Sequence, residues 1–194
     1  MKRLIFTLAI VFGVVTGVSA QSPGKVWVGG SVGINSSKVK GGESATSYKI
    51  IPELGYVVSD NWGIGIKLGY NHDEEAISIS DGSGNLISGK TKSEGFEVNP
   101  FVRYAFLKGD IGGLFIDGGV GYKYAKDKTR DIKTNTYEVG FRPGVSLNVS
   151  DKVALTGKFG FLGYEHEKEG DKKTDTFGFN LNMENIQLGV NFVF

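Results

Sequence analysis

A strict alternation of bulky apolar residues with glycines and charges constrains this chain more than any other feature. In residues 62–70, WGIGIKLGY, every second residue from Trp62 to Tyr70 is large and apolar, and the residues between them are glycines or Lys67. Because successive side chains of a β-strand point to opposite faces, this period of two predicts a strand. One face of the strand is bulky, and the other is tiny or charged.

The same pattern recurs along the chain and predicts eight strands. Each stretch is about as long as the roughly 9–11 residues that a tilted strand needs to cross the hydrocarbon of a membrane, or slightly longer. The 30 glycines among 194 residues and the 12% aromatic content also favour many strands joined by tight turns. The stretches are residues 26–34, 50–58, 62–70, 96–106, 114–124, 137–149, 153–161 and 186–194.

Short and long connectors alternate between these strands. Such alternation puts the short turns at one end of a sheet and the long segments at the other. The predicted fold is therefore all-β, an eight-stranded antiparallel up-and-down transmembrane β-barrel with short periplasmic turns and long extracellular loops. The short connectors are residues 59–61, 107–113 and 150–152, and the long ones are 35–46, 71–95, 126–136 and 165–176.

Two kinds of irregularity are expected within the strands. Pro52, Pro100 and Pro143 fall inside predicted strands. They are interpreted as bulges, because proline cannot donate a hydrogen bond to the neighbouring strand. A change of alternation before the last strand predicts a further bulge near Met183 to Asn185.

The alternation leaves open which face points inward. In a soluble carrier the bulky face would line the inside of the barrel. The interior of an eight-stranded barrel is only just filled by side chains, and roughly five large residues per strand would overfill it. The glycine-rich face is therefore predicted to lie inside and the bulky face outside, against lipid.

The first 20 residues have the pattern of a secretory signal peptide: a basic start, an apolar stretch from Leu4 to Val15, and small residues before Gln21. The predicted organisation is a signal peptide over residues 1–20 and one barrel domain over residues 21–194. Without Lys2 and Arg3, 20 of the 22 basic residues remain against 21 acidic ones, which gives no sign of a nucleic-acid partner. There is no cysteine, which excludes disulfides and a lipid anchored through cysteine.

The turn positions predict pairs of opposite charge inside the barrel. One turn is centred on Asp60 and the next on Asp110. Residues at equal distances along the chain from a turn centre face each other across the hairpin. In the third hairpin, centred on Asp151, the inward bases face glycines. The predicted pairs are Glu53 with Lys67, Arg103 with Asp117, and Glu97 with Lys123; Glu138 is the nearest acid to Arg142, and Lys158 faces Gly144.

The inward charges are nearly balanced, with four acids against five bases. Balance is expected of buried charges, because an unpaired one costs several kcal/mol. One interpretation is a narrow, ion-selective channel. The favoured interpretation is a closed interior held by ion pairs, because a barrel of eight strands leaves no continuous water path. The set is Glu53, Glu97, Asp117 and Glu138 with Lys67, Arg103, Lys123, Arg142 and Lys158.

Aromatic residues collect near both ends of the outward faces. They could stack on a ligand, but their placement favours two belts at the membrane surfaces. The group near the short turns is Tyr56, Trp62, Tyr104 and Phe106, and the group near the long connectors is Tyr70, Tyr122, Tyr124 and Tyr137.

The sequence contains no metal, nucleotide or nucleophile-elbow motif, so no cofactor is expected. Its only histidines lie in long connectors. His72 is followed by Asp73 and Glu74 and, further on, by Ser78 or Ser80, and His166 lies between Glu165 and Glu167. A histidine with a carboxylate and a hydroxyl could transfer acyl groups at the rim of the barrel. Solvated polar loops are the favoured interpretation, and the protein is expected not to be an enzyme.

The sequence resembles a known protein family. The signal peptide, the eight strands, the hairpin IIPELGYVVSDNWGIGIKLGY and the last residues GVNFVF are similar to the small outer-membrane β-barrel domains of the OmpA/OmpX kind, especially their Bacteroidetes-type branch. The resemblance covers the mature chain. Because the sequence stops with the last strand, a barrel without a peptidoglycan-binding domain is expected.

The resemblance implies a location and partners. It implies a porin-like or OmpA-like protein of the Gram-negative outer membrane, surrounded by outer-membrane lipid. In this family a terminal phenylalanine, here Phe194, is a recognition signal for the barrel-assembly machinery. The expected function is non-enzymatic: envelope integrity or surface interaction through the extracellular loops, whose sequences carry no ligand signature.

Overall fold

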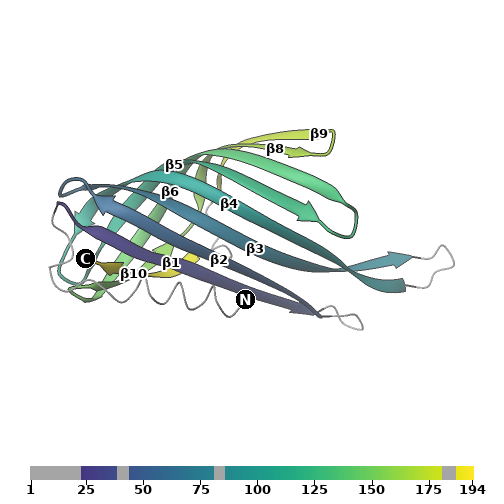
Figure 1. Cartoon of the computed structure of the whole chain (residues 1–194), viewed down its shortest axis with the longest axis horizontal. Coiled ribbons are helices and arrows are strands. Elements are labelled where there is room, and N and C mark those ends of the chain that lie inside the picture. Colours follow the sequence, from purple (N-terminus) through teal and green to yellow (C-terminus); the bar gives the residue numbers. More distant parts are fainter. Residues whose placement is uncertain (1–22, 39–43, 81–85, 181–186) are drawn as a thin grey trace.

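The computed structural model describes residues 23–38, 44–80, 86–180 and 187–194, and these residues form strands and turns (Figure 1). No helix among them is long and apolar enough to cross a membrane. The strands are β1 (Val26–Lys38), β2 (Ser44–Val57), β3 (Trp62–Ser80), β4 (Leu86–Lys108), β5 (Gly112–Asp127), β6 (Ile132–Ser150), β7 (Val153–Lys158), β8 (Phe161–Glu169), β9 (Lys172–Asn180) and β10 (Gln187–Val193).

The predicted eight-stranded antiparallel barrel is confirmed. Each strand from β1 to β6 pairs with the next, β7 pairs with both β6 and β10, and β10 pairs with β1. At the point of closure, the N–H of Val26 donates to Phe194 O at 3.1 Å and the N–H of Phe194 donates to Val26 O at 2.8 Å. β8 continues the path of β7 along β6, and β9 pairs with β8, so that β7 with β8 and β9 with β10 occupy one strand position each.

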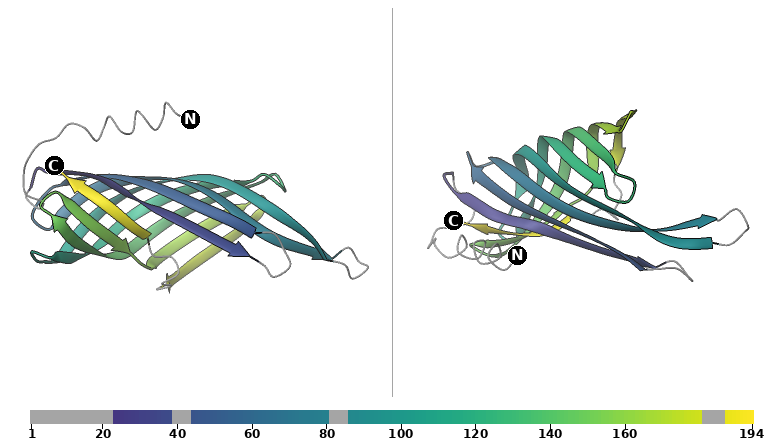
Figure 2. Two further views of the ribbon diagram at one scale, coloured as in Figure 1. Left: turned by 90° about the horizontal axis from the view of Figure 1, so that it is seen from below. Right: turned by 45° about the vertical axis from the view of Figure 1, so that its right-hand side comes forward.

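The long connectors are largely strand. β3 and β4 pair without interruption from Trp62 with Tyr104 to Ser80 with Leu86, so most of the predicted loop 71–95 is a hairpin. β8 and β9 meet at a tight turn around Gly170, whose φ is 57°. The strands therefore extend far beyond one end of the ring, as Figure 2 shows for β3, β4, β8 and β9. A loop sequence rich in small polar residues did not reveal this, because solvated strands carry the same composition.

An extra residue in the seventh strand position turns one predicted lipid-facing residue inward. β6 pairs Gly144 with Lys158 but Phe141 with Leu162, so the β7–β8 side contains one residue more. The extra residue is accommodated by a bulge at Gly160, whose φ is 71°. The expectation that Phe161 faces lipid is therefore wrong.

Of the three predicted proline bulges, the one at Pro143 is found, and those at Pro52 and Pro100 are not. The β2–β3 register is the same on both sides of Pro52, and the β4–β5 register is the same on both sides of Pro100. The backbone pairing is interrupted at each of these prolines without an added residue, because proline lacks only one N–H donor. Pro143 lies opposite the bulge at Gly160 and accepts a hydrogen bond from the Phe159 N–H at 3.1 Å. The bulge predicted near Met183 to Asn185 lies outside the described residues.

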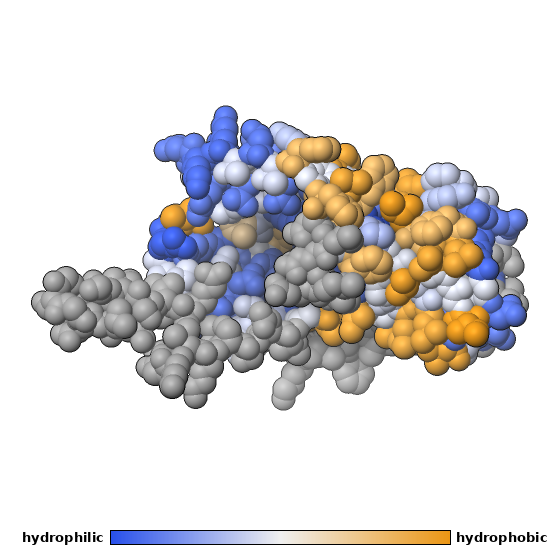
Figure 3. All heavy atoms as spheres, turned by 180° about the vertical axis from the view of Figure 1, so that it is seen from behind, coloured by the Kyte–Doolittle hydropathy of each residue, from blue (hydrophilic) through white to orange (hydrophobic). Residues whose placement is uncertain are grey.

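The outer surface of the ring is apolar. Ile64, Leu68 and Phe141 each expose about half of their surface, as do many of their outward neighbours. Figure 3 shows apolar residues gathered in a band on one face of the molecule, with hydrophilic residues beyond it. In water such a surface would be strongly unfavourable, whereas lipid is its natural solvent.

The interior holds large aromatic residues as well as the predicted glycines and charges. Trp27, Phe101 and Phe115 are only 5%, 4% and 3% exposed. Each ring lies against an inward glycine, because a Cβ added at Gly55 would meet the Trp27 ring and one at Gly144 would meet the Phe115 ring. The glycines therefore make room for aromatic rings, and the expectation of an interior with only small and charged residues is wrong.

Candidate functional site

Five charged side chains meet inside the lower half of the barrel, the half that carries the short turns. We call them the inner ion cluster. They come from five different strands, β2, β3, β4, β5 and β7, and all of them are at inward positions of the alternation. Their side chains expose 14% or less of their surface. The cluster consists of Glu53, Lys67, Arg103, Asp117 and Lys158.

Asp117 and Arg103 form the centre of the inner ion cluster. Arg103 Nε donates to Asp117 Oδ1 at 2.7 Å, and Arg103 Nη2 donates to Asp117 Oδ2 at 2.9 Å. The same Nη2 donates to Glu53 Oε1 at 2.9 Å. Lys67 Nζ lies 3.0 Å and Lys158 Nζ 3.4 Å from Asp117 Oδ2, and Lys158 also donates to Glu53. Each acid is therefore shared among bases from several strands.

The register and the ion pairs do not coincide. The strands place Glu53 opposite Lys67, Arg103 opposite Asp117, and Glu97 opposite Lys123, as the turn centres predict. Of these three, only Arg103 and Asp117 form an ion pair within the described residues. Glu53, Lys67 and Glu97 instead reach bases or acids on strands that are not neighbours, because long side chains meet across a narrow barrel. Lys123 pairs with Glu138 on the adjacent strand β6. The ion-pair partners that follow are Arg103 and Lys158 for Glu53, Asp117 for Lys67, Lys49 for Glu97, and Glu138 for Lys123.

Three aromatic rings enclose the Arg103 guanidinium. Its Cζ lies 4.2 Å from the ring centre of Phe115, 5.1 Å from that of Trp27 and 5.3 Å from that of Phe101. Trp27 Nε1 also donates to Glu53 Oε1 at 2.9 Å. Stacking on aromatic faces stabilises a desolvated guanidinium. The alternation contains the signal for these rings, because Trp27 and Phe115 each stand between two outward apolar residues.

A second ion cluster lies further toward the long hairpins. Glu138 accepts from Arg142 at 2.7 Å and lies 2.7 Å from Lys123 Nζ. The Arg142 guanidinium stacks on Phe161, with 4.6 Å between Cζ and the ring centre. Lys49 of β2 donates to Glu97 of β4 at 2.9 Å. Sequence reasoning missed Lys49, although it has the same parity as Glu53.

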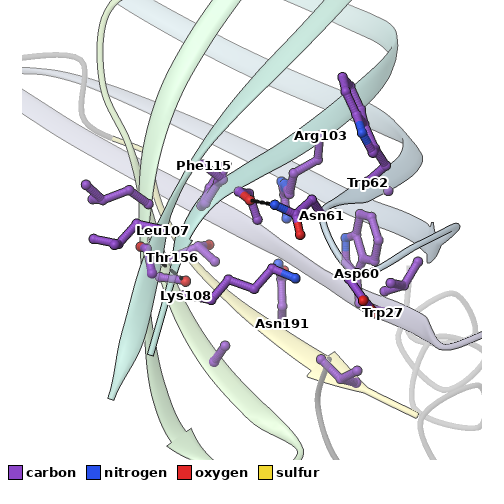
Figure 4. A pocket seen from close by; sticks show the side chains of 18 of the residues that line it. Trp27, Asp60, Asn61, Trp62, Arg103, Leu107, Lys108, Phe115, Thr156 and Asn191 are labelled. Atoms are coloured by element: carbon purple, nitrogen blue, oxygen red, sulfur yellow. Dashed lines mark hydrogen bonds between the residues drawn. The ribbon is translucent and has the colours of Figure 1, made fainter. Parts of the chain in front are cut away.

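A cavity of about 130 Å³ lies between the inner ion cluster and the short turns (Figure 4). Trp27, Arg103, Phe115, Thr156 and Asn191 are among its lining residues. At the level of the inner ion cluster, buried side chains replace this space. The lumen therefore has an open space at its lower end, next to the inner ion cluster.

The predicted aromatic belts occupy outward positions at two levels. Near the short turns Trp62 and Tyr104 lie 4.6 Å apart between ring centres. Near the long hairpins Tyr122 lies 5.2 Å from Tyr137, and Phe96 lies 5.4 Å from Tyr124. We call this second group, with Tyr164, the upper belt.

His72 lies on β3 just beyond the upper belt, and His166 lies on β8 at the level of Tyr137. Both face outward. His72 stacks on Tyr48 at 5.1 Å, with Nε2 3.8 Å from Glu74 and Nδ1 3.6 Å from Glu94. The side chains of Ser78 and Ser80 lie outside the described residues. No group of three metal-binding side chains occurs in the described part of the chain.

His166 Nδ1 lies 2.6 Å from Asp175 Oδ1, which also accepts a 2.5 Å hydrogen bond from the Tyr164 hydroxyl. The Tyr164 hydroxyl, followed by His166, holds the pKa of the Asp175 carboxyl below its usual range. Glu165, which neighbours His166 in the sequence, has the opposite parity and lies 3.9 Å from Lys123. His166 and Asp175 thus form a carboxylate–imidazole pair on the outer surface of the β8–β9 hairpin.

The sequence matches the model of the outer membrane protein beta-barrel domain family over residues 5–194, and the chain belongs to this family. No curated protein matches it. Among solved structures, the chain is similar to Neisserial surface protein A, with 16% identity over 87% of this chain and 94% of the other and a TM-score of 0.47. It is also similar to the attachment invasion locus protein Ail of Yersinia pestis, with 13% identity over 89% and 99% of the chains and a TM-score of 0.41.

Family and fold together define an integral β-barrel of the bacterial outer membrane. The apolar band of the ring faces lipid in that setting, and the strand extensions beyond the upper belt stand outside the hydrocarbon.

Proposed function

We propose that this protein is a non-enzymatic structural barrel with a closed lumen, which contributes to envelope integrity or to surface interaction through its extracellular hairpins. One observation carries the proposal: the inner ion cluster joins five strands across the lumen and is covered by aromatic rings. Conduction would require ions to pass through this cluster.

Closure follows from the energetics of the inner ion cluster. Asp117 contacts three bases within 3.4 Å, so its charge is already satisfied by the barrel itself. A permeating ion would have to displace one of these contacts in a region with little water, where an unpaired charge costs several kcal/mol. The cluster therefore acts as a crosslink between strands and not as a selectivity filter.

The proposed route to the membrane consists of export followed by barrel assembly. The basic and apolar residues of segment 1–20 support its removal as a signal peptide. Phe194 is the proposed signal for the barrel-assembly machinery, and its backbone hydrogen bonds to Val26 join the last strand position to the first. The extracellular hairpins, built from β3 with β4 and from β8 with β9, are the proposed surfaces for interaction.

Planar-bilayer recording tests closure. The wild-type protein is expected to show no discrete conductance steps in 1 M KCl, because the inner ion cluster fills the cross-section. Insertion is checked separately by the resistance of the reconstituted barrel to protease. Reproducible steps of one size from the inserted wild-type protein would contradict a closed lumen and would favour a narrow channel.

A further inference from the structure

A row of lysines crosses the outer surface just above the upper belt. Lys126 of β5 lies directly opposite Lys133 of β6, and Lys168 of β8 lies directly opposite Lys173 of β9. The two pairs are neighbours, because Lys168 faces Asn135, two residues along β6 from Lys133. All four have the outward parity of Tyr122 and Tyr137. We call these four residues the lysine row.

Like charges placed directly opposite each other destabilise a sheet, and here two such pairs lie side by side. Asp131 neutralises Lys126, with 2.6 Å between Oδ1 and Nζ. Asp175, the acid on the outer face beside Lys173, is engaged by His166 and Tyr164. Within the described residues Lys133, Lys168 and Lys173 have no ion pair, and all three are exposed. Asp131 and Asp175 also attract Lys133 and Lys173, respectively, so the lysine row sets four bases against two acids and keeps a surplus of positive charge.

The neighbouring strands β3 and β4 show a different arrangement at a similar height. Lys92 lies 3.2 Å from Glu74, and Lys128 lies 2.5 Å from Glu94. The hydrogen bond from Lys128 holds the pKa of the Glu94 carboxyl below its usual range. Lysines of these extensions thus have acidic partners on β3 and β4, whereas Lys133, Lys168 and Lys173 on β6, β8 and β9 face other lysines.

The height of the lysine row matches the lipid headgroups. Lys168 is two residues beyond His166, which pairs with Tyr137, and Lys133 is four residues beyond Tyr137. At about 3.3 Å per residue this is roughly 7–13 Å along the strand. A tilt of about 40° reduces it to roughly 5–10 Å in height. The polar region of one leaflet is roughly 5–8 Å thick. Figure 3 shows hydrophilic residues gathered beyond the apolar band.

We propose that Lys133, Lys168 and Lys173 bind the phosphate groups of a phosphorylated glycolipid in the outer leaflet. The surplus charge supplies the attraction, and the apolar band directly below contacts the acyl chains of the same molecule. Tyr137 and Tyr164, which are about half exposed, lie between the two and offer an amphipathic surface at the headgroup boundary. This inference depends on the barrel's place in the membrane and does not depend on closure of its lumen.

The test compares the affinity of the purified full-length mature barrel for two probes in uncharged detergent, diphosphoryl lipid A and chemically dephosphorylated lipid A. Each lysine near a charged membrane surface changes binding roughly fivefold, so the triple variant K133Q/K168Q/K173Q is expected to bind diphosphoryl lipid A on the order of a hundredfold more weakly. The matched control K92Q/K128Q, which alters lysines that already have acidic partners, is expected to bind as the wild type does. All variants are checked for the heat-dependent gel mobility of a folded barrel.

Three outcomes would overturn the proposal. The triple variant could bind diphosphoryl lipid A as tightly as the wild type, or the wild type could bind the dephosphorylated probe equally well. In a third measurement, inorganic phosphate at 10 mM is added to the bound lipid. Complete displacement of the lipid would mean that the site binds free phosphate. If the triple variant loses the folded mobility, the single variant K168Q, with an expected loss of roughly fivefold, decides the question.

Discussion

Replacing Asp117 with asparagine is expected to lower the free energy of unfolding by about 3–5 kcal/mol, the usual cost of removing one partner from a buried ion pair. Asp117 contacts Arg103, Lys67 and Lys158, and its side chain is only 2% exposed. The substitution leaves three buried bases with Glu53 as the one acid of the inner ion cluster. Urea unfolding in lipid vesicles, followed by tryptophan fluorescence, measures the change.

Two further variants show whether charge imbalance is the cause. Asp110 lies in an exposed turn, and Asp110→Asn is expected to change the free energy of unfolding by no more than about 0.5 kcal/mol. The double variant D117N/K67M removes one acid and one base, and it should recover part of the lost stability. Equal destabilisation by D117N and D110N, or no recovery in the double variant, would show that the inner ion cluster does not stabilise the barrel through its charge balance.

Substituting Gly55 with alanine is expected to destabilise the barrel by about 3 kcal/mol, at the upper end of the cost of overpacking. The added Cβ would lie 2.0 Å from Trp27 Cζ2 and 2.2 Å from Cε2. The indole cannot retreat easily, because its Nε1 donates to Glu53 and its ring lies over Arg103. The same unfolding measurement applies.

Gly178 provides a matched control in β9, because a Cβ added there meets nothing within 4 Å. Gly178→Ala is expected to be neutral or slightly stabilising, since alanine reduces the freedom of the unfolded chain. The double variant W27F/G55A, with a smaller ring, should recover part of the loss. If G55A is as stable as G178A, then the indole does not pack on Gly55 and the interior is looser than described.

Most of the barrel could be predicted from alternation alone. A period of two fixes which residues share a face, and a turn position fixes the partners across a hairpin. These rules gave the strand pairing of Glu53 with Lys67 and of Arg103 with Asp117. The same alternation gives Trp27 and Phe115 an inward parity, but the room for their rings comes from glycines on other strands, which the pattern within one strand does not show.

The remaining features depend on geometry that a sequence pattern does not express. The ion pair of Lys158 with Glu53 joins β7 to β2 across the lumen, so no rule for neighbouring strands could find it. The bulge at Gly160 changes the face of every residue that follows it on β8, which turns Phe161 inward and His166 outward. The extent of the hairpins was also hidden, because solvated strands and loops have the same polar composition.

The orientation of the two faces is the central claim, and site-directed spin labelling tests it directly. The chain contains no cysteine, so each introduced cysteine carries the only label. Labels at Ile64, Val102 and Phe141 in lipid vesicles should collide readily with oxygen and be shielded from a water-soluble nickel chelate. Labels at Ser146 and Thr156 should show little oxygen collision. Outward labels that the nickel chelate reaches freely, with oxygen-accessible labels inside, would mean that the apolar face is not in lipid and would contradict the account.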